Sequence, residues 1–191
     1  MKSPAFLQIA ILALLGMAST NSLYFFSSGD NCYETITDHI GCWNVTEEHC
    51  CHSADPFCVT AALMDSDQIT HTTYFTNGSS CAISDQLQNY DRCITSDNCC
   101  LYLPVAQDNS KCSAFWHWGE PSPDPNDQGE WDVHTVTERP CVQPNFLAYN
   151  DGLTARKILI PDGKLDHVVE MYSRSDFGAL GRYETLGGDG G

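Results

Sequence analysis

Two Cys-Cys doublets, at positions 50–51 and 99–100, constrain this chain more than any other feature of its sequence. Each doublet follows a lone cysteine at the same distance, has one more cysteine inside that interval, and is followed by another. The sequence therefore predicts one five-cysteine unit that is used twice, over residues 32–58 and 81–112. The cysteines of these units are all candidates for disulfides: Cys32, Cys42, Cys50, Cys51, Cys58, Cys81, Cys93, Cys99, Cys100 and Cys112.

The doublets limit how the cysteines can pair. Neighbouring side chains of an extended strand point to opposite faces, and adjacent cysteines bond to each other only in a strained ring. Each doublet should therefore tie its strand to two different neighbours. The chain has an odd number of cysteines, eleven, and Cys141 lies outside both units. We expect Cys141 to tie the C-terminal part to the units, and the odd cysteine would allow a disulfide-linked dimer. The sequence leaves the pairing itself open.

Residues 1–18 have the pattern of a secretory signal peptide. Lys2 gives a positively charged start, residues 5–17 are apolar except for Gln8, and Ala18 offers a small residue at which cleavage can occur. A high cysteine content is typical of proteins that fold in an oxidising compartment. Together these features predict a secreted, extracellular protein.

The formal net charge of the chain is −16 at pH 7. A surface this acidic repels the phosphate backbone of nucleic acids, so we expect no nucleic-acid partner. No segment after residue 18 is apolar enough to span a bilayer, and we expect no membrane insertion. Cationic partners are compatible with this charge, which would also keep a secreted protein soluble.

The fold class that we predict is small, disulfide-rich and mainly β. Residues 19–112 form the duplicated cysteine-rich domain, and residues 113–132 form an aromatic loop with several prolines and aspartates. Residues 133–175 form a C-terminal β segment tied by Cys141. Residues 176–191 are rich in glycine and are predicted to be a flexible, disordered tail.

Two parts of the chain carry the clearest strand signals. Residues 70–76 are rich in threonine and aromatic residues and end at the turn Asn77-Gly78, which predicts a strand. Residues 155–160 and 165–172 flank the turn Pro161-Asp162-Gly163, and this pattern predicts a C-terminal β-hairpin. In that turn proline presets its backbone angle and glycine accepts the positive φ that follows.

Candidate binding residues are three tryptophans, Trp116, Trp118 and Trp131. Exposed and coplanar indole rings would form a stacking platform for a sugar ring of a polysaccharide. The alternative is that they fill the core of a protein that is short of apolar volume. Asn44 and Asn77 each begin an Asn-X-Ser/Thr sequence, which accepts N-linked glycans on surface loops of secreted proteins.

We predict no metal and no cofactor, although two patterns resemble metal sites. His49-Cys50-Cys51-His52 contains metal-ligating residue types, but zinc needs free thiolates and a secreted protein oxidises its cysteines to disulfides. The loop 124–129 resembles the start of an EF-hand calcium loop. It has Gln128 at the fifth position and Thr135 where the bidentate glutamate belongs.

Eight cysteines within residues 42–112 follow the order C, CC, C, C, CC, C when Cys58 is left out: Cys42, Cys50, Cys51, Cys81, Cys93, Cys99, Cys100 and Cys112. This order and its spacing resemble the class I hydrophobins, small fungal proteins that assemble at air–water interfaces. The resemblance implies a surface-active coat protein, although the loops here carry acidic residues where hydrophobin loops are apolar. It also implies four disulfides: Cys42–Cys99, Cys50–Cys93, Cys51–Cys81 and Cys100–Cys112.

In its signal peptide, size and cysteine density, the chain also resembles the small secreted cysteine-rich proteins of filamentous fungi. That resemblance implies an effector with a role in virulence, or a cell-wall-associated protein, and not an enzyme. The sequence itself contains no nucleophile elbow, no His-Glu-X-X-His motif and no phosphate-binding glycine loop. Cysteines held in disulfides are also poor candidates for a thiol nucleophile.

The leading hypothesis is a secreted, disulfide-stabilised, non-enzymatic interaction protein. Its partner would be an extracellular host protein or a cell-wall polysaccharide. The alternatives are a hydrophobin-like surface-active coat protein and a knottin-like inhibitor or toxin.

Overall fold

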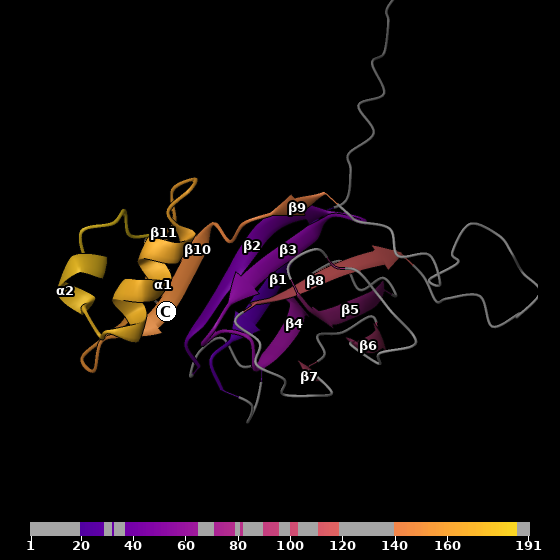
Figure 1. The fold of residues 1–191 in the computed structure, drawn as a ribbon, viewed down its shortest axis with the longest axis horizontal. Coiled ribbons are helices and arrows are strands. Elements are labelled where there is room, and N and C mark those ends of the chain that lie inside the picture. Colours follow the sequence, from indigo (N-terminus) through magenta and orange to yellow (C-terminus); the bar gives the residue numbers. More distant parts are fainter. Residues whose placement is uncertain are drawn as a thin grey trace, which may run out of the picture.

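The computed structural model is a sandwich of two β-sheets, with helices gathered at one end (Figure 1). It describes residues 20–28, 32, 37–64, 71–78, 81, 90–95, 100–102, 111–118 and 140–186. Strands dominate these residues and disulfides join them, so the mainly β, disulfide-rich fold class is confirmed.

Within the described residues, the larger sheet has six strands in the order β11-β10-β2-β1-β4-β7. Its strands are β1 (Thr20–Phe26), β2 (His39–Thr46), β4 (Thr60–Met64), β7 (Cys100–Tyr102), β10 (Phe146–Asn150) and β11 (Ala155–Leu159). The smaller sheet has five strands in the order β6-β5-β8-β3-β9. Its strands are β3 (Cys50–Ala54), β5 (His71–Asn77), β6 (Tyr90–Thr95), β8 (Lys111–Trp118) and β9 (Cys141–Val142). The predicted strand at 70–76 is thus confirmed as β5.

β1 lies inside the larger sheet and is buried on both faces. It pairs with β2 on one side and with β4 on the other. Leu23 and Phe25 belong to the core between the sheets, where the ring centroid of Phe25 lies 6.0 Å from that of Phe75. Tyr24 and Phe26 belong to a second buried cluster on the opposite face. Apolar residues at consecutive positions therefore let one strand support two layers of side chains.

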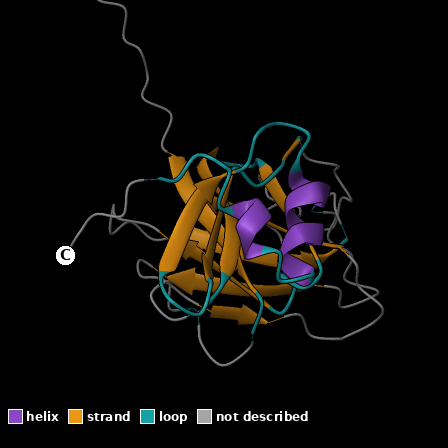
Figure 2. Ribbon diagram, turned by 90° about the vertical axis from the view of Figure 1, so that its left-hand side faces the viewer, coloured by secondary structure: helices purple, strands orange, loops and turns teal. Residues whose placement is uncertain are grey.

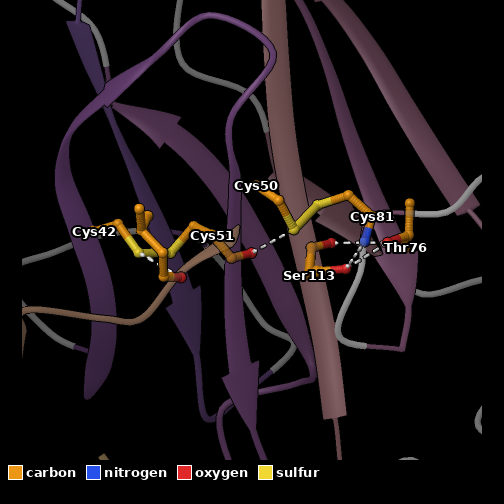
Figure 3. Close-up of a disulfide and its surroundings, with 7 residues drawn as sticks. Cys42, Cys50, Cys51, Thr76, Cys81 and Ser113 are labelled. Atoms are coloured by element: carbon orange, nitrogen blue, oxygen red, sulfur yellow. Dashed lines mark hydrogen bonds between the residues drawn. A yellow bond between two sulfur atoms is a disulfide. The ribbon is translucent and has the colours of Figure 1, made fainter. Parts of the chain in front are cut away.

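Four disulfides join the described strands: Cys32–Cys100, Cys42–Cys51, Cys50–Cys81 and Cys58–Cys112. Cys93 is also disulfide-bonded. The neighbours Cys50 and Cys51 bond to different partners, as the alternation of side chains along a strand requires (Figure 3). Three of the four bonds join residues 32–58 to residues 81–112. The two cysteine units are therefore cross-linked to each other and do not close separately.

β8 corrects the prediction of a loop over residues 113–132. Residues 113–118 belong to this strand, which pairs with β5 on one side and with β3 on the other. Residues 113–117 are buried, because a strand inside a sheet between two layers has both faces covered. The rest of the predicted loop lies outside the described residues.

The tie between Cys141 and the cysteine units is made by the backbone. Cys141 lies in β9, which runs parallel to β3 and places Cys141 opposite Cys50. The side chain of Cys141 is exposed and belongs to none of the four disulfides given above. The C-terminal part is thus attached at this point by strand pairing.

The C-terminal hairpin lies one element earlier than the sequence suggested. The strand predicted at 155–160 is confirmed as β11, but its partner is β10 and the turn between them is at 151–154. Asp151 Oδ1 closes this turn by accepting hydrogen bonds from the backbone N–H groups of Leu153 and Thr154, at 2.9 and 2.8 Å.

The prediction of a return strand at 165–172 is wrong, because this segment forms helix α1 (Leu165–Ser173). Its buried side chains are at Leu165, Val168, Val169 and Met171. Positions 165, 168 and 169 repeat with the period of a helix and do not alternate as in a strand. The predicted turn before it is present, and Gly163 there has a φ of 72°.

The prediction of a disordered tail is wrong for residues 176–186. Helix α2 (Phe177–Leu180) follows Asp176, whose side chain caps it. The backbone N–H of Leu186 then donates to the carbonyl of Lys157 at 2.9 Å, so the chain returns along the edge strand β11. Seen from this end of the molecule, both helices lie in front of the strands (Figure 2).

Candidate functional site

Residues 140–145, which we call the crossing segment, run from the smaller sheet to the larger one, as the orange stretch from β9 to β10 shows (Figure 1). At its start the carbonyl of Pro140 accepts a hydrogen bond from Cys50 N at 2.9 Å. At its end Asn145 N donates to the carbonyl of Gly41 at 2.9 Å. Gln143, between these anchors, lines two hollows in the surface.

The larger hollow has a volume of about 360 Å³ and lies between β2 and the crossing segment. Its lining residues are Cys42, Trp43, Asn44, Val45, Thr46, His49, Val142, Gln143, Asn145 and Asp162. Amide, hydroxyl, imidazole and carboxylate groups thus surround one indole. Such a mixture suits a ligand that has both an apolar face and hydrogen-bonding groups.

A β-bulge in β2 places Asn44 at the rim of the larger hollow. The pairing with β1 shifts its register at this point, and Asn44 has a φ of 57° and an exposed side chain. Bulges redirect side chains, and asparagine adopts the left-handed backbone conformation more readily than most residues. The first predicted glycosylation acceptor therefore lies at the surface, as expected.

Trp43, the indole of the larger hollow, is fixed from three sides. Its ring stacks on Phe146 with centroids 4.3 Å apart, and its Nε1–H donates to Tyr24 Oη at 3.3 Å. Its backbone N–H donates to Asn145 Oδ1 at 3.0 Å. Phe146 in turn packs on Gly41, where a Cβ would lie 2.7 Å from the ring. The wall of the hollow is therefore preorganised.

Lys157 adds a positive charge to the same aromatic group. Its Nζ lies 4.7 Å from the ring centroid of Phe146, 4.8 Å from that of Trp43 and 5.6 Å from that of Tyr24. Cation–π attraction is strongest when a cation is partly removed from water, as for this half-buried side chain. Lys157 thus links edge strand β11 to the wall of the larger hollow.

Other polar groups in the larger hollow differ in what they already bind. Thr46 Oγ1 lies 2.7 Å from His49 Nδ1 within a tight turn. The side-chain amide of half-buried Gln143 hydrogen-bonds to no group in the part of the chain that the structure describes, and Asp162 is exposed. Gln143 and Asp162 thus add polar residues to the lining of the larger hollow.

The smaller hollow, of about 200 Å³, lies on β3 beside the start of α1. Its lining residues are His52, Ser53, Ala54, Lys111, Gln143, Gly163, Leu165 and Asp166. Burial, followed by the nearby charge of Lys111, lowers the pKa of His52 below its usual value. The backbone of Val142 lies near the imidazole of His52 and partly offsets this lowering of the pKa, while Nδ1 is buried and has no hydrogen-bond partner among the described residues.

The tryptophan platform predicted from the sequence is wrong at Trp116. This side chain is fully buried in the core between the sheets, and its Nε1–H donates to the carbonyl of Val45 at 3.1 Å. The side chain of Trp118 and the whole of Trp131 lie outside the described residues. The alternative, a tryptophan that fills the core, is therefore the one that holds for Trp116.

Asn77 and the motif around Cys50 and Cys51 also fall within the described part of the chain. Asn77 is the last residue of β5 and precedes Gly78, whose φ is 99°. The side chain of Asn77 is not among those that the structure describes. Cys50 and Cys51 are both committed to disulfides and supply no thiolate for a metal. Among the described residues, no three histidine, cysteine, aspartate or glutamate side chains are grouped to hold a metal ion.

Sequence reasoning missed Trp43, His52 and Gln143. Trp43 precedes the glycosylation acceptor Asn44 directly, which was the one local signal that it lies near the surface. His52 and Gln143 are far apart in the chain and meet only because β9 pairs with β3. No local pattern could have indicated that contact.

No family model, curated protein or solved structure matches the chain. The disulfides implied by the hydrophobin resemblance do not form, because Cys42, Cys50, Cys51 and Cys100 each have a different partner. None of the helices within the described residues is long and apolar enough to cross a membrane.

Proposed function

We propose that this is a secreted, disulfide-stabilised binding protein without enzymatic activity. Its ligand would be an extracellular host protein or a cell-wall polysaccharide, held at the smaller hollow beside the crossing segment. Disulfides cross-link the strands, and hydrogen bonds hold the crossing segment at both ends. This rigidity supports the proposal, because a site that is rigid before binding loses little conformational entropy when the ligand binds.

The observation that carries the proposal is the Nδ1 of His52, which is buried and has no hydrogen-bond partner among the described residues. A lowered pKa favours the neutral ring, in which one nitrogen donates a hydrogen bond and the other accepts one. We propose that Nδ1 is the accepting nitrogen, because it has no hydrogen-bond partner among the described residues. Buried polar atoms are nearly always paired, so we propose that a ligand hydroxyl or amide N–H becomes the partner of Nδ1 by displacing the atoms that cover it.

Charged groups at the rim extend what this hollow can recognise. Lys111 supplies a donor and Asp166 an acceptor, and both side chains are exposed. Gln143 offers both a donor and an acceptor. Sugar hydroxyls and peptide groups alike present donors and acceptors at short spacing, so this chemistry fits either class of partner.

The geometry around His52 favours binding over catalysis. Ser53 is the next residue in β3, so the two side chains point to opposite faces and cannot form a nucleophile–base pair. The contact of Thr46 with His49 closes a turn, because His49 N also donates to the carbonyl of Thr46 at 3.1 Å. Neither pair is arranged as a catalytic constellation.

The test is a binding screen of the secreted protein against cell-wall polysaccharides and extracellular proteins, with His52→Phe as the variant. Losing one hydrogen bond of roughly 1.4 kcal/mol should weaken binding about tenfold. His167→Phe, at an exposed position of α1, is the matched control and should bind like the unchanged protein. Equal affinity of His52→Phe, or release of products from a polysaccharide, would contradict the proposal.

A further inference from the structure

The larger hollow has a feature that the smaller one lacks, a glycan acceptor in its own lining. We propose that Asn44 carries an N-linked glycan and that the first sugar of this glycan, N-acetylglucosamine, packs into the larger hollow. The hollow is thus a docking site for the protein's own modification. This inference is independent of the ligand proposed for the smaller hollow.

Attachment is chemically simple at this position. Asn44-Val45-Thr46 is the acceptor sequence, and the bulge in β2 turns Asn44 outward. The transfer joins Asn44 Nδ2 to C1 of N-acetylglucosamine as Nδ2 loses a proton. The bond from C1 to its lipid diphosphate donor breaks, and the diphosphate leaves with the electron pair. The product places the sugar at the rim of the hollow.

The hollow offers the contacts that this sugar needs. N-acetylglucosamine has an apolar ring face, hydroxyl groups and an acetamide. The indole of Trp43 and the half-exposed side chain of Val142 provide apolar surface, and Gln143 and Asp162 provide hydrogen-bonding groups. A sugar bonded to Asn44 is already beside these groups, so its effective concentration there is high and weak contacts suffice.

The second acceptor supplies a contrast within the same chain. Asn77 precedes Gly78, and a Cβ built at Gly78 would meet no atom within 4 Å. Asn77 is not among the lining residues of either the larger or the smaller hollow. We therefore expect a glycan at Asn77 to extend into solvent and to leave stability unchanged, which makes Asn77 the matched control for Asn44.

The experiment compares secreted protein from a host that attaches high-mannose glycans. An endoglycosidase trims each glycan to one N-acetylglucosamine, and the variant Asn44→Asp carries none at that site. Aspartate is chosen because it also tolerates a positive φ. We expect the trimmed protein to melt like the intact one. Asn44→Asp should melt about 2–4 °C lower, as is typical for a loss of one contact group in a chain of this size.

Two further measurements decide the interpretation. Asn77→Asp makes the same change of charge and should not shift the melting temperature. Gln143→Ala should lower the melting temperature of the trimmed protein but not that of Asn44→Asp, because only the former has a sugar in contact with Gln143. Mass spectra without a sugar on Asn44, equal shifts for Asn44→Asp and Asn77→Asp, or additive effects with Gln143→Ala would each overturn the inference.

Discussion

Residues 32–112 and residues 146–186 share one core but are stabilised in different ways. The first region contains all four of the disulfides given above, whereas the second contains no cysteine. In the second region β10, β11, α1 and α2 follow one another in the chain and pack on their neighbours. The difference shows where this chain needs covalent help.

The distance along the chain between contacting elements explains that difference. The bonds Cys32–Cys100 and Cys58–Cys112 span 68 and 54 residues, whereas β10 and β11 pair across the short turn at 151–154. Bringing distant segments together costs more loop-closure entropy than closing a short turn. Disulfides lower that cost by restricting the unfolded chain, and three of the four given above, Cys32–Cys100, Cys50–Cys81 and Cys58–Cys112, span 31 residues or more.

The C-terminal region is held to the sandwich by ordinary contacts. Leu147, Ile158 and Leu180 are fully buried in the core between the sheets. Asp38 adds a polar anchor, since its carboxylate accepts hydrogen bonds from Tyr172 Oη at 2.7 Å and from Asn150 N at 2.9 Å. One carboxylate thus joins the loop before β2 to both β10 and α1.

The largest expected effect comes from removing disulfides of different span. Replacing Cys58 and Cys112 together by alanine should lower the free energy of unfolding by about 4 kcal/mol, because their bond closes a long loop. Replacing Cys42 and Cys51 together should cost about 3 kcal/mol, since this bond spans 9 residues. Chemical denaturation monitored by fluorescence measures both values.

Complete reduction extends the same test. Because typical domains are stable by only roughly 5–15 kcal/mol, losing several disulfides at once should unfold the protein. Residues 146–186 should unfold with the rest, since their apolar side chains lie in the shared core. A reduced protein that keeps its near-ultraviolet circular dichroism, or a larger loss for the short-span pair, would contradict the entropic account.

Removing the hydroxyl group from each of two tyrosines in the C-terminal region should change the free energy of unfolding in opposite directions. Tyr172→Phe removes the hydrogen bond to Asp38 and should cost about 1–2 kcal/mol. Tyr149→Phe removes a buried hydroxyl without a hydrogen-bond partner among the described residues, and should stabilise the fold by roughly 1 kcal/mol. Equal signs for the two variants in urea unfolding would contradict this assignment.

Tyr172 should also make the free energy of unfolding depend on pH in the alkaline range. Burial and the hydrogen bond to Asp38 raise the pKa of Tyr172 to about 12, above its value of about 10 in the unfolded chain. Its contribution is therefore complete below pH 10 and is lost as the pH rises through 12. For this half-exposed group the loss is roughly 1 kcal/mol. Tyr172→Phe should remove that loss, and Tyr183→Phe, which leaves the Asp38 contact intact, should not.

The sequence predicted those parts of the fold whose determinants are local. Strand β5 follows from its threonine and aromatic residues and from the turn signal Asn77-Gly78, and the divergent bonding of Cys50 and Cys51 follows from strand geometry. The prediction for segment 165–172 was wrong because the turn Pro161-Asp162-Gly163 was interpreted as the turn of a β-hairpin, whereas the buried residues Val168 and Val169 belong to a helix. Their spacing from Leu165 suits a helix, and packing on the sheet decided between helix and strand.

The candidate site was harder to predict because it depends on contacts between distant residues. Trp116 was predicted to bind a ligand because it belongs to an aromatic run, but it lies in β8 and its side chain is buried in the core. Gln143 meets both Trp43 and His52 only where the crossing segment joins the two sheets. A single sequence holds no local pattern for such a meeting point, although Asn44 was correctly placed at the surface.

The smallest expected effect concerns His52, whose protonation should change both the free energy of unfolding and the affinity for the ligand. Burial and the charge of Lys111 lower the pKa of His52, so below pH 6.5 the unfolded chain takes up a proton that the folded protein resists. Stability should therefore fall as the pH drops from 6.5 towards the folded pKa, and His52→Phe should reduce this slope in urea unfolding at pH 7 and pH 5. His167→Phe, at its exposed position, is the control and should leave the slope unchanged.

A protonated Nδ1 no longer accepts a hydrogen bond, so the affinity for the ligand at the smaller hollow should also weaken as the pH falls from 6.5. A slope and an affinity that both stay the same in His52→Phe would show that this imidazole serves neither the fold nor the ligand.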